Sequence, residues 1–102
     1  MTKETMLEML KVDLGIFTEA YDERLKQYLE DAAEEIKREG ITLSDTVGDG
    51  NLQIMYAAWL WRCRKDGDGM PRMLRYRMNN RLFSEKMRTT PNGGSNDDEE
   101  ES

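Results

Sequence analysis

The residues that could carry chemistry in this chain are carboxylates, arginines and one thiol, because its 102 residues include no histidine. Histidine is the commonest general base and a frequent zinc ligand, so the usual catalytic triads and zinc sites are missing. The chain also lacks the glycine-rich loop, closed by Lys and Ser or Thr, that cradles a nucleotide phosphate. We therefore predict a protein that is not an enzyme and that uses no metal or other cofactor.

Two aspartates in the segment Asp66-Gly67-Asp68-Gly69 come closest to a calcium loop. Such a loop would continue with an oxygen ligand, whereas Met70 and Pro71 follow here. We interpret the segment as a turn between two helices, with Pro71 in the first turn of the helix that follows it. Cys63 is the only cysteine, so no disulfide forms within the chain, and its position in an apolar helical stripe predicts a structural role.

A cluster of positive side chains occupies the sequence between residues 62 and 88. It comprises Arg62, Arg64, Lys65, Arg72, Arg75, Arg77, Arg81, Lys86 and Arg88. Such a cluster can bind nucleic-acid phosphates, so a small helical DNA-binding regulatory protein is one hypothesis. Two features argue against sequence-specific recognition of DNA. The arginines of the last predicted helix alternate with methionines, and the turn before that helix is long for a helix-turn-helix. Contact with other proteins is the preferred interpretation.

The net charge of −6 is unevenly distributed along the chain. Residues 1–46 contain six bases and twelve acids, residues 47–90 contain nine bases and four acids, and residues 91–102 contain five acids and no base. Opposite charges in separate segments favour packing of one subunit against another. Ordinary solvated faces are the alternative interpretation.

The spacing of apolar residues predicts four helices, of which the first two precede residue 41. The first covers about residues 2–12 and is closed by Gly15, a residue type that favours helix ends. Thr18 is expected to cap the second helix, and Gly40 is expected to stop it. The apolar face of this helix comprises Tyr21, Leu25, Tyr28, Leu29, Ala32 and Ile36.

The third and fourth helices flank the glycine-rich turn. A loop over residues 41–48 leads to the third helix, which Asp49 or Asn51 would cap, and the fourth runs from Pro71 to about Lys86. The residues expected in the core are Leu25, Leu29, Ile36, Leu52, Tyr56, Trp59 and Leu60. The predicted fold class is all-α, a small bundle of about four helices with two long central helices and a short N-terminal helix.

A second apolar stripe on the third helix, opposite its core stripe, consists of Ile54, Ala57 and Trp61. Another helix of the same chain or a neighbouring subunit could cover it. Arg77 and Arg81 lie one turn apart within the apolar arc of the fourth helix, so they need carboxylate, phosphate or carbonyl partners. We predict that these five residues form a subunit interface.

The chain is expected to divide into a helical domain over residues 1–88 and a disordered acidic tail over residues 89–102. The closing sequence PNGGSNDDEEES has no apolar residue and ends in acids, so it cannot build a core. No apolar run reaches the length that crosses a bilayer, and the N-terminus is acidic where a signal peptide would be basic. We therefore expect synthesis in the cytoplasm and no membrane partner.

The order of these segments resembles the small head-tail connector proteins of tailed bacteriophages, also called head-completion or adaptor proteins. The resemblance covers about residues 3–86 and rests on the segments LKVDLGI, DERLKQYLEDAAEEI, GITL, YAAWLW and MPRMLRYRMNNRLF. The Asp-Glu-x-Leu start of the second predicted helix and the Tyr-Ala-x-Trp core of the third carry most of its weight.

The resemblance implies a subunit of a homo-oligomeric ring that lies beneath the portal protein in the virion and is assembled in the host cytoplasm. The ring extends the DNA channel, through which packaged DNA passes without sequence-specific binding, and it docks a stopper or tail-completion protein. In the family a chain end commonly reaches the portal, so the last residues, including Met87, Arg88 and Pro91, are a candidate docking arm. A solubilising tail is the alternative for this segment.

Overall fold

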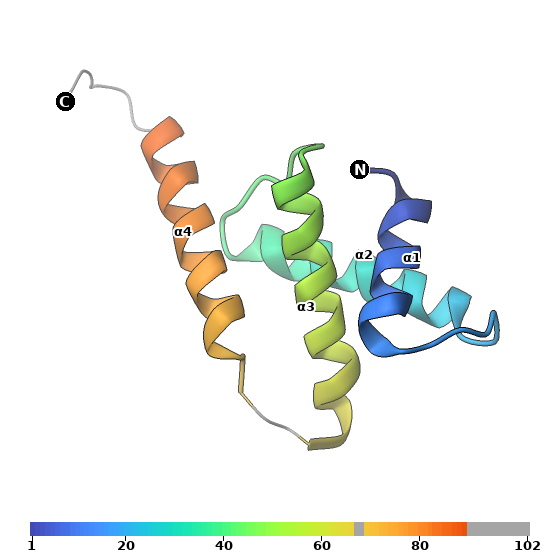
Figure 1. Ribbon diagram of the computed structural model, residues 1–102. Helices are drawn as coiled ribbons and strands as arrows, with labels where there is room; N and C mark the ends of the chain where they lie inside the picture. The colour runs from blue at the N-terminus through green and yellow to red at the C-terminus, as the bar shows by residue number, and fades with distance from the viewer. Residues whose placement is uncertain (67–68, 90–102) are drawn as a thin grey trace.

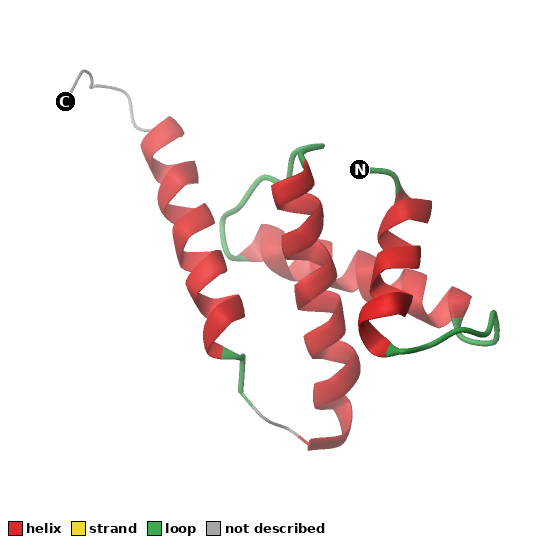
Figure 2. Ribbon diagram, viewed as in Figure 1, coloured by secondary structure: helices red, strands yellow, loops and turns green. Residues whose placement is uncertain are grey.

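Four α-helices joined by loops form the part of the chain that the structure describes, in agreement with the predicted all-α class (Figures 1 and 2). The computed structural model describes residues 1–66 and 69–89, with side chains described for residues 1–63 and 69–87. The helices are α1 (Lys3–Leu14), α2 (Asp22–Arg38), α3 (Val47–Asp66) and α4 (Arg72–Thr89). The expected tail lies, beyond Thr89, outside the described residues.

Helix α1 begins and ends with the signals that the sequence provides. The hydroxyl of Thr2 accepts a hydrogen bond from the backbone N–H of Thr5 at 3.1 Å, which satisfies one donor of the first turn. Gly15 ends the helix in the left-handed conformation, with φ 72°. The helix continues to Leu14, two residues beyond the predicted end.

Helix α2 begins later than predicted. The hydroxyl of Thr18 accepts from the N–H of Ala20 at 3.2 Å within the preceding loop, and the helix starts at Asp22 without a side-chain cap. The carboxylate of Asp22 instead pairs with the ammonium of Lys11 at 2.8 Å, which ties the start of α2 to the end of α1. Gly40 follows the helix with φ 106°, as its predicted role as a stop requires.

Helix α3 begins earlier than predicted, because Thr46 is its cap. The Thr46 hydroxyl accepts from the backbone N–H of Asp49 at 3.2 Å, so Val47 and Gly48 belong to the first turn. The predictions that Asp49 or Asn51 would cap this helix are therefore wrong.

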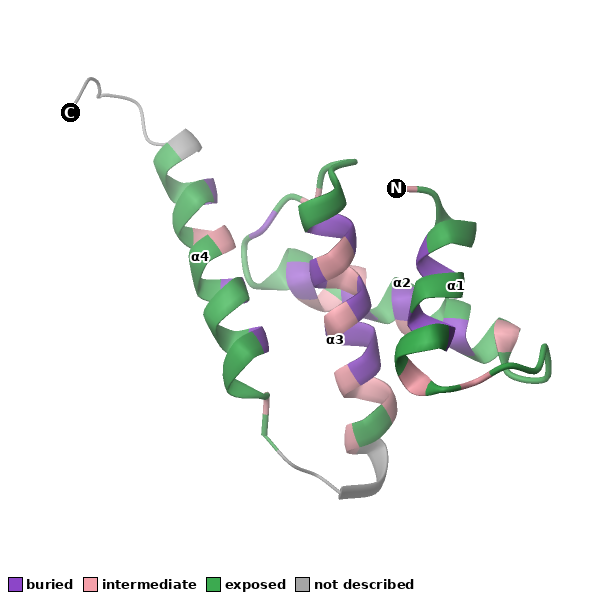
Figure 3. Ribbon diagram, in the orientation of Figure 1, coloured by how far each residue is buried: buried purple, intermediate pink, exposed green. Residues whose placement is uncertain are grey.

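The core lies where α3 meets the other three helices (Figure 3). Five of the seven predicted core residues are buried, whereas Trp59 and Leu60 are half-buried against the core. The confirmed five are Leu25, Leu29, Ile36, Leu52 and Tyr56. Figure 1 shows α1 and α4 on opposite sides of α3, with α2 crossing behind. Among the described helices, none is long and apolar enough to span a membrane.

Candidate assembly surface

The apolar stripe predicted as a subunit contact lies inside the chain's own core. Ile54 and Ala57 are 2% and 0% exposed. Trp61 meets Tyr21 and Tyr28 edge to face, with ring centroids 5.7 and 5.6 Å apart. The assignment of Ile54 and Ala57 to a subunit interface is therefore corrected, whereas the assignment of Trp61, which is half-buried, stays a prediction. The physical reason is that α3 is the central helix, and α1 and α2 of the same chain cover the side that α4 leaves open.

Arg81 also has its partners within the chain. Its guanidinium donates to both carboxylate oxygens of Asp49, at 2.8 and 3.1 Å, and to Glu85 Oε1 at 2.9 Å. A further N–H donates to the backbone carbonyl of Thr42 at 2.7 Å. The prediction that Arg81 needs carboxylate or carbonyl partners is thus confirmed, and its assignment to a subunit interface stays a prediction. We call Arg81, Asp49, Glu85 and Thr42 the Arg81 network.

The Arg81 network connects α4 to the start of α3 and to the loop before it. Asp49 is 5% exposed and also accepts from the N–H and the hydroxyl of Ser44, both at 2.8 Å. Burial alone would raise the pKa of the Asp49 carboxyl, but the hydrogen bonds from Arg81 and Ser44 outweigh it and hold the pKa below its ordinary value. The bond to Asp49 in turn raises the pKa of Arg81. The sequence spacing of Arg81 and Glu85, one turn apart on a helix, could have indicated this pair.

The exposed side of α4 carries large apolar side chains around one polar residue, Asn80. Leu74 and Met78 are buried against the core, whereas Tyr76, Phe83 and Met87 on the opposite side of the helix, and Met73 at the edge nearer α3, are 59% to 65% exposed. These four define the α4 outer face: Met73, Tyr76, Phe83 and Met87. Arg77 lies beside this face and is exposed, so the expectation that it cannot be solvated is wrong, while its assignment to a subunit interface stays a prediction.

A second exposed apolar surface lies on α1 and the loop that follows. Met9 and Val12 are 39% and 66% exposed, and Phe17 in the loop is 85% exposed. We call these three residues the α1 outer face. Glu8 and Asp13 flank it and are exposed. At 100° per residue they fall on either side of the line from Met9 to Val12, so this surface is apolar with acidic edges.

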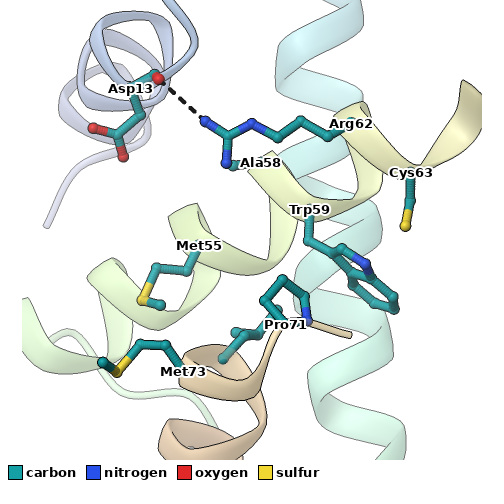
Figure 4. A pocket seen from close by; sticks show the side chains of 9 residues that line it. Asp13, Met55, Ala58, Trp59, Arg62, Cys63, Pro71 and Met73 are labelled. Carbon is teal, nitrogen blue, oxygen red and sulfur yellow. Dashed lines mark hydrogen bonds between the residues drawn. The ribbon is translucent and has the colours of Figure 1, made fainter. Parts of the chain in front are cut away.

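A hollow of about 580 Å³ opens between α3 and α4 (Figure 4). Its lining is Asp13, Met55, Ala58, Trp59, Arg62, Cys63, Pro71, Met73 and Leu74. Arg62 donates to the backbone carbonyl of Asp13 at 3.3 Å, and the buried indole N–H of Trp59 finds no acceptor in the described part of the chain. The lining is chiefly apolar, so the hollow suits an apolar group better than a charged substrate.

The predicted docking residues at the end of α4 are only partly described. Met87 is 64% exposed and belongs to the α4 outer face. The side chain of Arg88 and the whole of Pro91 lie outside the described residues. Residues 1–63 and 69–87 contain no group of three Cys, Asp or Glu side chains placed to hold a metal ion.

Comparison with known proteins finds no matching family model, no matching curated protein and no matching solved structure. Function must therefore be argued from the surfaces described above.

Proposed function

We propose that this chain is a structural protein of a tailed bacteriophage, a subunit of the head-tail connector ring beneath the portal. The observation that carries the proposal is that α4 has apolar residues on two sides. Leu74 and Met78 pack on the chain's own core, while Tyr76 and Phe83 on the opposite side are 62% and 65% exposed. A surface helix of a monomer usually has one apolar stripe, so an uncovered second stripe is typical of a helix that packs on a partner.

The use of charge in the molecule supports a structural role. Arg81 joins helix α4 to the loop at Thr42 and to the start of α3 through Asp49. This network aligns α4 on the domain and so fixes the direction of its outer face. A subunit that must fit identical neighbours in a ring needs such a fixed direction.

Binding of purified portal rings from the same phage tests the proposal. We expect the chain to sediment with the portal at a defined stoichiometry and to form a ring on it that electron microscopy can resolve. A chain that stays in the free fraction at every mixing ratio would contradict the connector role.

Binding of duplex DNA is the second candidate, because Arg72, Arg75 and Arg77 are exposed on α4. The exposed Tyr76 among these arginines and Phe83 beyond them weigh against it, since a phosphate-binding surface gains little from such side chains. Fluorescence anisotropy with a labelled duplex separates the two functions. Affinity that falls steeply as salt rises, without portal binding, would favour the DNA-binding candidate.

A further inference from the structure

Two exposed apolar surfaces lie on α1 and α4, helices on opposite sides of α3, and their borders have opposite charge. The α4 outer face follows the spacing 73, 76, 83 and 87, which a straight helix places within an arc of about 80° over a length of about 21 Å, with the polar Asn80 in the same arc. Arg72 and Arg77 lie on either side of this arc. The α1 outer face, formed by Met9, Val12 and Phe17, has Glu8 and Asp13 on either side of it.

None of the four flanking charges forms a side-chain ion pair in the described part of the chain. The ion pairs of the described residues involve other groups, such as Lys11 with Asp22 and Arg81 with Asp49. Arg72, Arg77, Glu8 and Asp13 are all exposed. They are therefore available to pair across a contact, where complementary charge selects the partner and its register.

We propose that the α4 outer face of one copy packs on the α1 outer face of the next copy. The arginines beside α4 would then meet the carboxylates beside α1, and the apolar residues between them would leave water together. The inference rests on the proposed self-assembling role and adds the two surfaces that meet.

The arrangement of the helices gives this contact a direction. Figure 1 shows α1 and α4 on opposite sides of α3, and Figure 3 shows that each of these helices has buried residues on its inner side. A contact between α4 and a neighbouring α1 therefore uses different surfaces of the two copies and leaves one of each free at the ends. Such a head-to-tail contact repeats until the rotation between copies closes a ring.

A charge exchange tests the contact by sedimentation velocity over a wide concentration range. One variant, Arg72→Glu/Arg77→Glu, replaces the basic residues beside α4, so that both surfaces have acidic borders. The other, Glu8→Lys/Asp13→Lys, replaces the acidic residues beside α1, so that both surfaces have basic borders. Each variant alone should self-associate at least about tenfold more weakly than the native chain, because like charges would face each other. An equimolar mixture should regain assembly, because each α4 then finds an α1 of opposite charge.

The control variant Arg24→Glu/Lys37→Glu makes the same change in net charge as the first variant, at two exposed positions on α2. It should assemble as the native chain does. Circular dichroism must show unchanged melting for every variant.

Native assembly that both charge variants retain, or that their mixture fails to regain, would overturn the α4 to α1 contact and leave the connector role standing. A native chain that stays monomeric at all concentrations would also overturn it, while portal binding decides the connector role separately.

Discussion

At the scale of single residues, the structure distinguishes two arginines that sequence spacing treats alike. Arg77 and Arg81 lie one turn apart, and the helical pattern places both in the apolar arc of α4. Arg81 is enclosed by Asp49, Glu85 and the carbonyl of Thr42, whereas Arg77 is exposed. Sequence spacing could have indicated the partner Glu85, one turn further along α4, but not Asp49 and Thr42, which lie more than thirty residues before Arg81.

Replacement of Arg81 by methionine should lower the free energy of unfolding by about 3 kcal/mol, because it leaves the carboxylate of Asp49 buried without its charged partner. Arg77→Met is the matched control and should change stability by less than about 0.5 kcal/mol, since Arg77 is exposed. Urea denaturation followed by circular dichroism measures both. Equal effects of the two replacements would show that the Arg81 network does not hold α4.

The lowered pKa of Asp49 makes its contribution to stability depend on pH. Since the pKa in the folded state lies below that of the unfolded chain, the contribution is complete above the unfolded value of about 3.9 and is lost as pH falls toward the folded value. The native chain and an Asp49→Asn variant should therefore differ most near neutral pH and converge in acid. Unfolding free energies from about pH 7 to about pH 3 provide the test. A difference that stays constant over this range would contradict the assignment.

At the scale of the helices, apolar spacing predicted their number and their buried sides, because periodicity reports which side of a helix leaves water. Helix starts were predicted less well. Thr18 and Thr46 are both threonines before an acidic turn, and only the folded chain shows that Thr46 caps a helix while Thr18 stabilises a loop. The Lys11 to Asp22 ion pair, which fixes the start of α2, depends on how α1 and α2 pack and cannot be read from local sequence.

These two threonines make a direct comparison possible. Thr46→Ala should destabilise the chain by about 1 kcal/mol, because the N–H of Asp49 loses its acceptor at the first turn of α3. Thr18→Ala should cost less, since its hydroxyl binds an exposed loop N–H. Thermal and urea unfolding of both variants give the two values. A larger loss from Thr18→Ala would mean that the capping assignment is wrong.

At the scale of the whole molecule, the sequence predicted a helical domain but misplaced its outward surface. Helix α3 is apolar on two sides. Its sequence pattern is the same whether another helix of its own chain or a second copy covers the second side. Here the chain itself covers Ile54 and Ala57. The uncovered apolar surfaces are instead on α1 and α4, whose outer faces remain exposed once their inner sides have packed. Which surfaces remain free thus depends on how the helices are arranged around α3.

The central claim is that the α4 outer face is a contact surface. The most direct test is mass photometry of the native chain and of a Tyr76→Ser/Phe83→Ser variant. Each is measured with and without portal rings. Because both residues are largely exposed, the variant should melt at the native temperature. The account predicts that the native chain forms a ring, alone or on the portal, and that the variant stays monomeric in both settings. A variant that assembles as well as the native chain would contradict it.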